Sequence, residues 1–203
     1  MLRHLGYKPS SRMDSRVKNL IDEAIERAKQ LAEPAAIYLI DTISKLSADE
    51  VKLGCGIIIQ SKPVARVMRG CVKAVIFAAT IGPAAENEAA RIMNGNPAEA
   101  VTLDSAAGEA AEGAVEYLHK SIQIHSHRAN LHLTPRFSPG YGDWPLEAQR
   151  DIFACLKPER IGISLNQAYM MIPRKSVSGI SGIGPIPGIR TGASPCKQCA
   201  KKL

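Results

Sequence analysis

The chain has 203 residues, which suits one domain or one domain with an appendage, and 45% hydrophobic residues with only 4% aromatics predict an aliphatic core. Its 26 Lys and Arg exceed its 19 Asp and Glu, giving a net charge of +7, but no long basic run or basic–aromatic stripe accompanies this excess, which argues against nucleic-acid binding. No segment reaches the roughly 18 apolar residues of a membrane span, the start lacks a signal-peptide core, and five cysteines are an odd number for a disulfide framework, so we expect a cytoplasmic protein.

The first half of the chain shows alternating helix and strand patterns. Apolar residues at helical spacing predict an amphipathic helix over residues 14–32, capped by Asp14 or Ser15 and ended by Pro34. The continuous apolar run at 72–81 predicts a buried strand. Two further strands are predicted at 35–43 and 56–60, and a short helix at 62–70.

The second half is dominated by a long helix predicted over residues 98–124, which a helix at 82–93 precedes. The apolar stripe of the long helix is largely alanine, so a neighbouring element must pack close against it. The stripe comprises Val101, Ala107, Ala111, Ala114, Val115, Leu118 and Ile122. A further helix is predicted at 145–156, and strands at 161–165, 169–172 and 176–180.

The order of these elements predicts the fold class. Helices and strands alternate irregularly, without βαβ repeats, which favours an α+β fold: a single domain with a mainly antiparallel sheet and flanking helices. The dense glycines and prolines that begin at Gly179 predict that regular structure ends there. We expect the domain to span residues 1–185, followed by a flexible tail at 186–203.

The segment 136–145 is a candidate binding loop, because its two prolines fix φ and its two glycines permit positive φ. The guanidinium of Arg136 can bind a carboxylate through two parallel hydrogen bonds, and Tyr141 offers a ring and a hydroxyl. Backbone groups of residues 137–140 could read the edge of a base. The alternative is an arginine in a surface salt bridge beside a proline-stiffened turn.

Other titratable clusters allow two interpretations each. Glu109, Glu112 and Glu116 lie on one face of the long helix, either as a solvated stripe or as an acidic patch that faces a ligand or a partner's histidine. Three nearby histidines lack the i, i+4 spacing of a helical zinc site, so we expect no metal there. They are His119, His125 and His127.

The cysteines fall into two groups. Cys55, Cys71 and Cys155 stand in apolar contexts typical of buried structural cysteines. Cys196 and Cys199 form a CxxC, which supplies two of the four ligands that zinc needs. A metal or cluster shared across a dimer is the functional alternative for this pair.

Three motifs resemble the activation domain of cobalamin-dependent methionine synthase. The first is Arg136-Phe-Ser-Pro-Gly-Tyr141, and the second is Ile-Gly-Ile-Ser-Leu-Asn-Gln-Ala-Tyr-Met-Met-Ile-Pro from Ile161, continued by Ser176-Val-Ser-Gly179. The third covers residues 101–119 of the long helix, which end in Tyr-Leu-His. The resemblance is clear over about residues 101–179.

The resemblance implies the activity. The chain would be a freestanding subunit of the methionine synthase methyltransferase system, acting in trans on a cobalamin-binding methionine synthase that lacks its own activation domain. It would present the methyl group of S-adenosylmethionine to cobalamin carried by that partner, while a flavodoxin or ferredoxin-type donor supplies one electron. Holding sulfonium and cobalt in line needs no protein nucleophile, so no catalytic residue is expected.

The resemblance also implies residue roles. Arg136 would bind the methionine carboxylate, the backbone of Phe137 and Tyr141 would hold the adenine with Tyr141 near the corrin, and Glu112 would face a histidine of the cobalamin domain. The implied cofactor-binding set is Arg136, Phe137, Pro139, Gly140, Tyr141, Glu112, Ser178, Gly179 and Ser181.

Three departures from the family pattern leave other functions open. Gly108 stands where the family has a second acid, Ser181-Gly182 replaces an aromatic pair, and the family's Asp-Trp-Thr-Pro segment has no counterpart. One alternative is a non-enzymatic module that docks on a corrinoid protein. The other is a metal- or cluster-bearing activator of another corrinoid methyltransferase, which uses Cys196 and Cys199.

Overall fold

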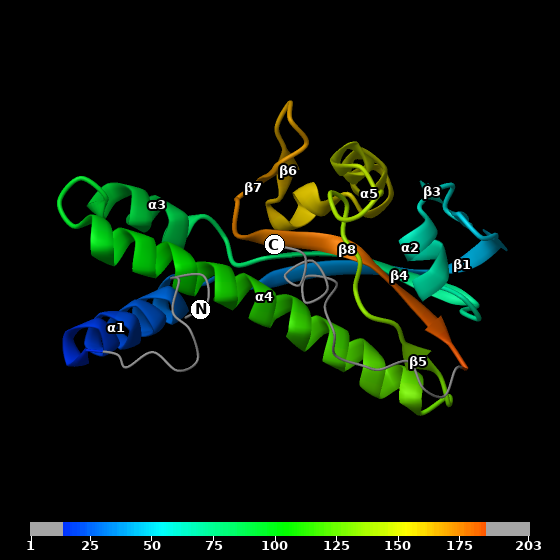
Figure 1. Cartoon of the computed structure of the whole chain (residues 1–203), viewed down its shortest axis with the longest axis horizontal. Helices are drawn as coiled ribbons and strands as arrows, with labels where there is room; N and C mark the ends of the chain where they lie inside the picture. Colours follow the sequence, from blue (N-terminus) through cyan, green and yellow to red (C-terminus); the bar gives the residue numbers. More distant parts are fainter. Residues whose placement is uncertain (1–13, 186–203) are drawn as a thin grey trace.

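The computed structural model describes residues 14–185, which form a six-stranded antiparallel sheet in the order β3-β2-β1-β4-β8-β5 with helices on both faces (Figure 1). The predicted α+β class is confirmed. The sheet contains β1 (Ala35–Leu46), β2 (Glu50–Leu53), β3 (Ile58–Gln60), β4 (Lys73–Thr80), β5 (His132–Leu133) and β8 (Ser176–Gly184), and a separate hairpin pairs β6 (Ser164–Leu165) with β7 (Met171–Ile172). The helices are α1 (Ser15–Leu31), α2 (Lys62–Val67), α3 (Ala84–Ile92), α4 (Pro97–His127) and α5 (Gln149–Leu156), with 3-10 turns η1 (Leu146–Ala148) and η2 (Pro158–Ile161).

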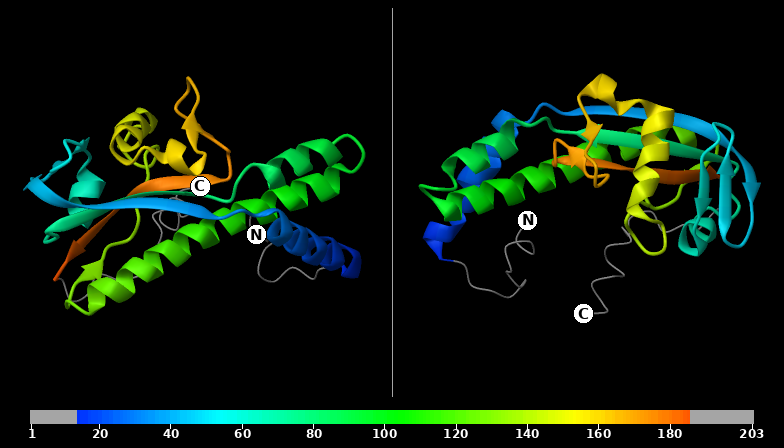
Figure 2. Two further views of the ribbon diagram at one scale, coloured as in Figure 1. Left: turned by 180° about the vertical axis from the view of Figure 1, so that it is seen from behind. Right: turned by 90° about the horizontal axis from the view of Figure 1, so that it is seen from above.

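The sheet separates two layers of helices, as the two views of Figure 2 show. On one face α4 crosses the sheet, where Val75 and Phe77 of β4 pack against it. On the other face α5 packs on Ile76 of β4. Because successive side chains of a strand point to opposite faces, this continuous apolar strand serves both layers. The prediction of a buried strand at 72–81 is thus confirmed.

The predicted helices are confirmed, with small changes of boundary. Asp14 caps α1, since its Oδ1 accepts the backbone N–H of Arg16 at 2.8 Å. The buried alanines Ala107 and Ala111 let α4 lie close to the end of β4. Val101 was predicted to face the core and is 49% exposed, because the neighbouring positions Ala100 and Leu103 take the buried side of α4.

The prediction that regular structure ends at Gly179 is wrong. Strand β8 continues to Gly184, and the residues from Gly179 to Gly184 are all buried. A Cβ on Gly182 would lie 2.5 Å from Sγ of Cys71, and one on Gly184 would lie 2.7 Å from the carbonyl oxygen of Gly70. Close packing between β8 and the segment before β4 therefore requires glycine at these two positions.

Three smaller expectations also change. Strands β2 and β5 were not predicted, and the strand expected at 161–165 shrinks to β6 because η2 extends to Ile161. Cys55 is exposed at the turn after β2, contrary to the expectation of burial, whereas Cys71 is buried and Cys155 is half-buried. The predicted tail at 186–203 lies outside the described residues.

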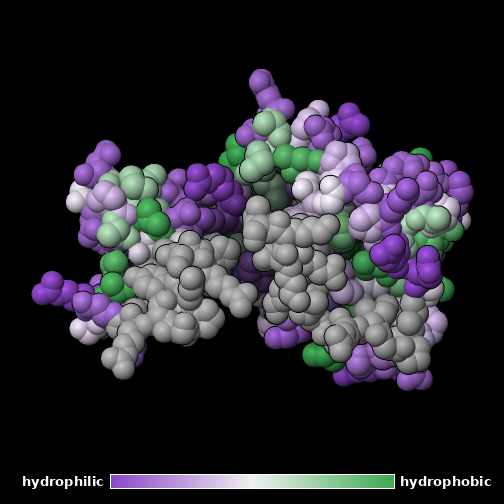
Figure 3. Space-filling model, viewed as in Figure 1, coloured by the Kyte–Doolittle hydropathy of each residue, from purple (hydrophilic) through white to green (hydrophobic). Residues whose placement is uncertain are grey.

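The β6–β7 hairpin is one of the apolar regions exposed on the described surface. Figure 3 shows hydrophobic side chains around the β6–β7 hairpin, where Met170 and Ile172 are 51% and 49% exposed. Across residues 14–185, every helix is too short or too polar to cross a bilayer.

Candidate ligand site

The loop that carries Arg136 is fastened to β8 by its backbone. Phe137 donates its N–H to the carbonyl of Ile180 at 2.9 Å and accepts the N–H of Ile180 at 2.8 Å. One residue later, the hydroxyl of Ser138 donates to the carbonyl of Ser178 at 2.6 Å. The predicted site segment 136–141 and the Ser-Val-Ser-Gly motif therefore lie side by side, but the N–H of Phe137 is already used within the protein.

The tip of the loop is a closed turn. Gly140 and Gly142 have φ of +90° and +64°, conformations that favour glycine. Gly140 donates its N–H to the carbonyl of Trp144 at 2.8 Å, and the buried indole of Trp144 packs against the ring of Phe137. The expected rigid loop shape follows from these contacts.

Asp143 ties this turn to α2. Its carboxylate accepts the hydroxyl of Ser61 and the backbone N–H of Lys62, the latter at 3.2 Å. Ser61 in turn caps α2 by accepting the N–H of Val64. A carboxylate near the first turn of a helix is electrostatically favourable. Asp143, which lies in the turn at the loop tip, therefore fastens the loop to the start of α2.

Arg136 and Glu112 come together, as their shared assignment to one site requires. Nη2 of Arg136 donates to Oε2 of Glu112 at 3.2 Å and lies 4.0 Å from Oε2 of Glu116. The arginine side chain is only 18% exposed, whereas those of Glu112 and Glu116 are 57% and 52% exposed. Arg136 thus forms a salt bridge with Glu112, and this contact fixes its guanidinium beside the loop.

A lysine stands next to the position where the family pattern has an acid. A Cβ on Gly108 would lie 3.9 Å from Nζ of Lys175. The side chain of Lys175 is 12% exposed and pairs with Asp104 at 2.9 Å, and Arg174 reaches the same carboxylate at 3.2 Å. Gly108, one turn along α4 from Glu112, therefore lies beside a lysine that is already paired with Asp104.

The other predicted site residues divide by exposure. Tyr141 is 41% exposed and Gly140 is exposed, so both face solvent at the loop tip. Pro139, Ser178, Gly179 and Ser181 are buried. Ser178 donates to Oε1 of Gln149, and the hydroxyl of Ser181 is the one buried side-chain oxygen without a partner among the described residues. The buried residues of this set pack inside the protein and support the loop and the sheet.

His119 of α4 lies near Arg136 and has a shifted pKa. Burial lowers its pKa, and the nearby positive charge of Arg136 lowers it further. Its Nε2 lies 3.3 Å from the carbonyl of Thr134. His125 contacts the carbonyl of Ser121, and His127 packs on His132.

The depressed pKa of His119 predicts a pH dependence of stability. The unfolded chain protonates His119 near pH 6.5 while the folded chain resists, so the free energy of unfolding should fall as the pH drops below 6.5. Urea unfolding at pH 7.5 and 5.5 should show a smaller loss for His119→Gln than for wild type. His125→Gln is the matched control, and an equal loss in all three proteins would contradict the assignment.

No metal site is found in the described part of the chain. Residues 14–185 contain no group of three or more His, Cys, Asp or Glu side chains that could hold an ion. Cys196 and Cys199 lie outside the described residues.

Sequence reasoning missed several residues that build the site. Asp143, Gln149 and Lys175 have no motif signal of their own, because their roles depend on partners 29 to 82 positions away in the chain, or on the fold of β8. Glu116 had been noted only as part of an acidic stripe. The spacing of charged residues along α4 does not reveal that Arg136 lies close to Glu116.

The fold and the loop define the class of protein. The crystal structure of the MetH reactivation domain bound to AdoHcy has the same fold, with a TM-score of 0.67, 17% sequence identity, and coverage of 92% of this chain and 70% of that one. Residues 64–185 match the family described as vitamin B12 dependent methionine synthase, activation domain. This chain therefore belongs to the methionine synthase activation domain family. Among curated proteins, none matches the chain significantly.

Proposed function

We propose that this protein binds S-adenosylmethionine at the 136–141 loop and reactivates cobalamin held by a partner, a cobalamin-binding methionine synthase. The observation that carries the proposal is Arg136, a guanidinium held at low exposure beside a rigid loop in a chain of the activation domain family. Family membership supports the link to the methionine synthase system. That the structural relative contains AdoHcy supports the choice of ligand.

The donor set fits the ligand. The carboxylate of S-adenosylmethionine can accept paired hydrogen bonds from Arg136. Glu116 offers a carboxylate to its ammonium and sulfonium charges, and the exposed ring of Tyr141 offers a stacking surface for adenine. When bound, S-adenosylmethionine supplies an electrophilic methyl group. The residues of this chain hold and orient it.

Positioning is the whole contribution that this arrangement requires. Transfer of a methyl group between two bound groups gains most from fixed alignment, and the proposed role of Arg136 and its neighbours is to supply that alignment. Glu112, which is 57% exposed beside Arg136, is the residue that we propose to meet the partner. A flavodoxin or ferredoxin-type protein is the proposed electron donor, and the proposed setting is the cytoplasm.

A docking function without S-adenosylmethionine is the second candidate. It is favoured by the amine of Lys175 next to Gly108, since a cation in this position repels the ammonium and sulfonium groups of the ligand. The two candidates differ in one property, which is whether the isolated protein binds S-adenosylmethionine.

Calorimetry on the full chain separates them. We expect S-adenosylmethionine and S-adenosylhomocysteine both to bind with 1:1 stoichiometry. If neither binds while a cobalamin-loaded methionine synthase module still forms a complex, the docking function replaces the proposal. Methyl-cobalamin formation on that module, followed by its visible spectrum with and without this protein, tests the activity in trans.

A further inference from the structure

The sheet has an open edge along the first half of β1. In the described part of the chain, β2 pairs with β1 only from Ile43 onward, and nothing pairs with residues 35–41 on that side. Ile43 donates its N–H to Val72 on the β4 side, whereas the carbonyl of Thr42 accepts the N–H of Gly54 on the opposite side. Backbone groups alternate along a strand, so the even residues point outward at the edge. These residues are Ala36, Tyr38 and Ile40.

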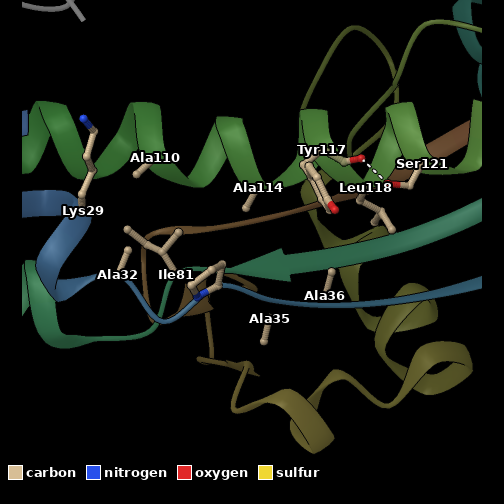
Figure 4. A pocket seen from close by; sticks show the side chains of 11 residues that line it. Lys29, Ala32, Ala35, Ala36, Ile81, Ala110, Ala114, Tyr117, Leu118 and Ser121 are labelled. Atoms are coloured by element: carbon tan, nitrogen blue, oxygen red, sulfur yellow. Dashed lines mark hydrogen bonds between the residues drawn. The ribbon is translucent and has the colours of Figure 1, made fainter.

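An apolar hollow runs along the same edge on the α4 face. Figure 4 shows Tyr117 pointing from α4 toward β1, above Ala35 and Ala36. This hollow of about 710 Å³ joins a second one of about 330 Å³ through Leu118 and Ser121. Tyr38 and Ile40, which border the second hollow, are 50% and 43% exposed, and Tyr117 is 77% exposed.

This edge lacks the protection that natural edge strands carry. Charged side chains and bulges usually discourage pairing with another chain, and residues 35–40 contain no charge, although 22% of the whole chain is charged. An exposed apolar edge of this kind is suited to pairing with a strand.

We propose that a second copy of this protein covers the edge, its β1 pairing antiparallel with β1 about a two-fold axis at Tyr38. Ala36 of each copy then faces Ile40 of the other, and the outward N–H and C=O groups are paired. The inference goes beyond the proposed function and does not depend on it.

The charges at the two ends of the strand match this register. Glu33 and Asp41 bracket the apolar stretch of β1. Lys29 borders one end of the joined hollow, and Lys73 borders the other. Each end of the strand thus carries one acid and one lysine, so antiparallel pairing offers Lys73 of the second copy to Glu33 and Lys29 of the second copy to Asp41.

The exposed area is of the right order for a dimer. A whole aromatic side chain covers roughly 200 Å², so Tyr38 and Tyr117 together expose about 250 Å² in each copy at their 50% and 77% exposure. A specific interface buries about 800 Å² per partner. Two side chains thus account for about a third of the requirement before Ile40 and the backbone edge are added.

Sedimentation of the full chain tests the proposal. We expect a dimer at about 50 µM, and we expect Tyr38→Lys with Ile40→Lys to produce a monomer that keeps the far-ultraviolet circular dichroism spectrum of the folded protein. Neither substitution removes a hydrogen bond within the sheet, because the side chains are exposed. Met170→Lys with Ile172→Lys places the same charges on another exposed apolar site and should leave the dimer intact.

Cross-linking gives an independent reading if the double lysine variant fails to fold. Tyr38→Cys should form a symmetric adduct with a short bifunctional maleimide, identified by peptide mapping, whereas Met170→Cys should not. A wild-type monomer at all concentrations would overturn the proposal. So would a dimer that survives the β1 substitutions, or an absence of cross-linking at residue 38.

Discussion

Arg136→Ala is expected to lower the affinity for S-adenosylmethionine by roughly 30-fold or more. Hydrogen bonds to charged groups contribute about 2 kcal/mol each, and each 1.4 kcal/mol is tenfold in affinity. Arg136 is 18% exposed, so part of its solvation is already lost, and a ligand carboxylate meets a guanidinium that needs little further ordering. Isothermal calorimetry on the two proteins measures the difference directly.

Two further variants make this result specific. Arg136→Lys keeps the charge and loses the planar pair of donors, so it should retain part of the affinity, between wild type and Arg136→Ala. Arg150→Ala removes a 73% exposed arginine that also pairs with a carboxylate, at 3.6 Å from Asp151, and should bind as wild type does. Equal binding by Arg136→Ala and wild type would remove Arg136 from the site.

Gly179→Ala is expected to destabilise the protein by about 3 kcal/mol, near the upper end for inserting a methyl group into a packed interior. The new Cβ would lie 2.6 Å from the carbonyl oxygen of Phe137 and 3.0 Å from the ring of Phe77. That carbonyl already accepts the N–H of Ile180, so the loop must move away from β8. Urea unfolding should show the loss, and ligand affinity should fall with it.

Gly113→Ala is the matched control. Gly113 lies on α4 with nothing within 4 Å of the position that a Cβ would take. Alanine is favoured over glycine inside a helix by about 1 kcal/mol, so this substitution should stabilise the protein. If the two substitutions shift the urea midpoint in the same direction, the contact between Gly179 and Phe137 does not constrain the fold.

Local sequence signals predicted the elements whose stability is local. The cap of α1 by Asp14 and the close approach of α4 through alanine follow from short-range patterns. The short strand β5 could not be found this way, because its two residues are strands only by pairing with β8. Val101 shows the limit of periodicity, since one apolar residue on a helix does not fix the orientation of its face.

The glycines of β8 show why composition gave a wrong prediction of where regular structure ends. Glycine marks irregular backbone in one context and close contact between elements in another, and the sequence does not distinguish them. Only the position of Cys71 and Gly70 beside the strand shows that Gly182 and Gly184 are required by space. A similar ambiguity affected Cys55, which lies at an exposed turn although its apolar neighbours Leu53 and Ile57 are buried.

For the site, the motif located Arg136, Tyr141 and Glu112, but burial decided what the remaining residues do. Ser178 and Ser181 share a motif with Gly179, and their hydroxyls are enclosed within the protein. Their role as cofactor-binding residues stays a prediction. Because both hydroxyls are enclosed, these residues would act on a ligand through the loop that covers them. The partner of Arg136 on α4 follows from the crossing of the helix over the sheet, which no short motif encodes.

In the proposed function, the contact between Arg136 and Glu112 would couple two binding events. The same carboxylate that holds the guanidinium is the group proposed to meet the partner, so drawing Glu112 outward alters the electrostatic field that a ligand carboxylate meets at Arg136. Thermodynamic reciprocity then applies: whatever factor the partner adds to ligand affinity, the ligand must add to partner affinity. Under the proposed function, the ion pair between Arg136 and Glu112 would make methyl-donor loading and complex formation one linked equilibrium.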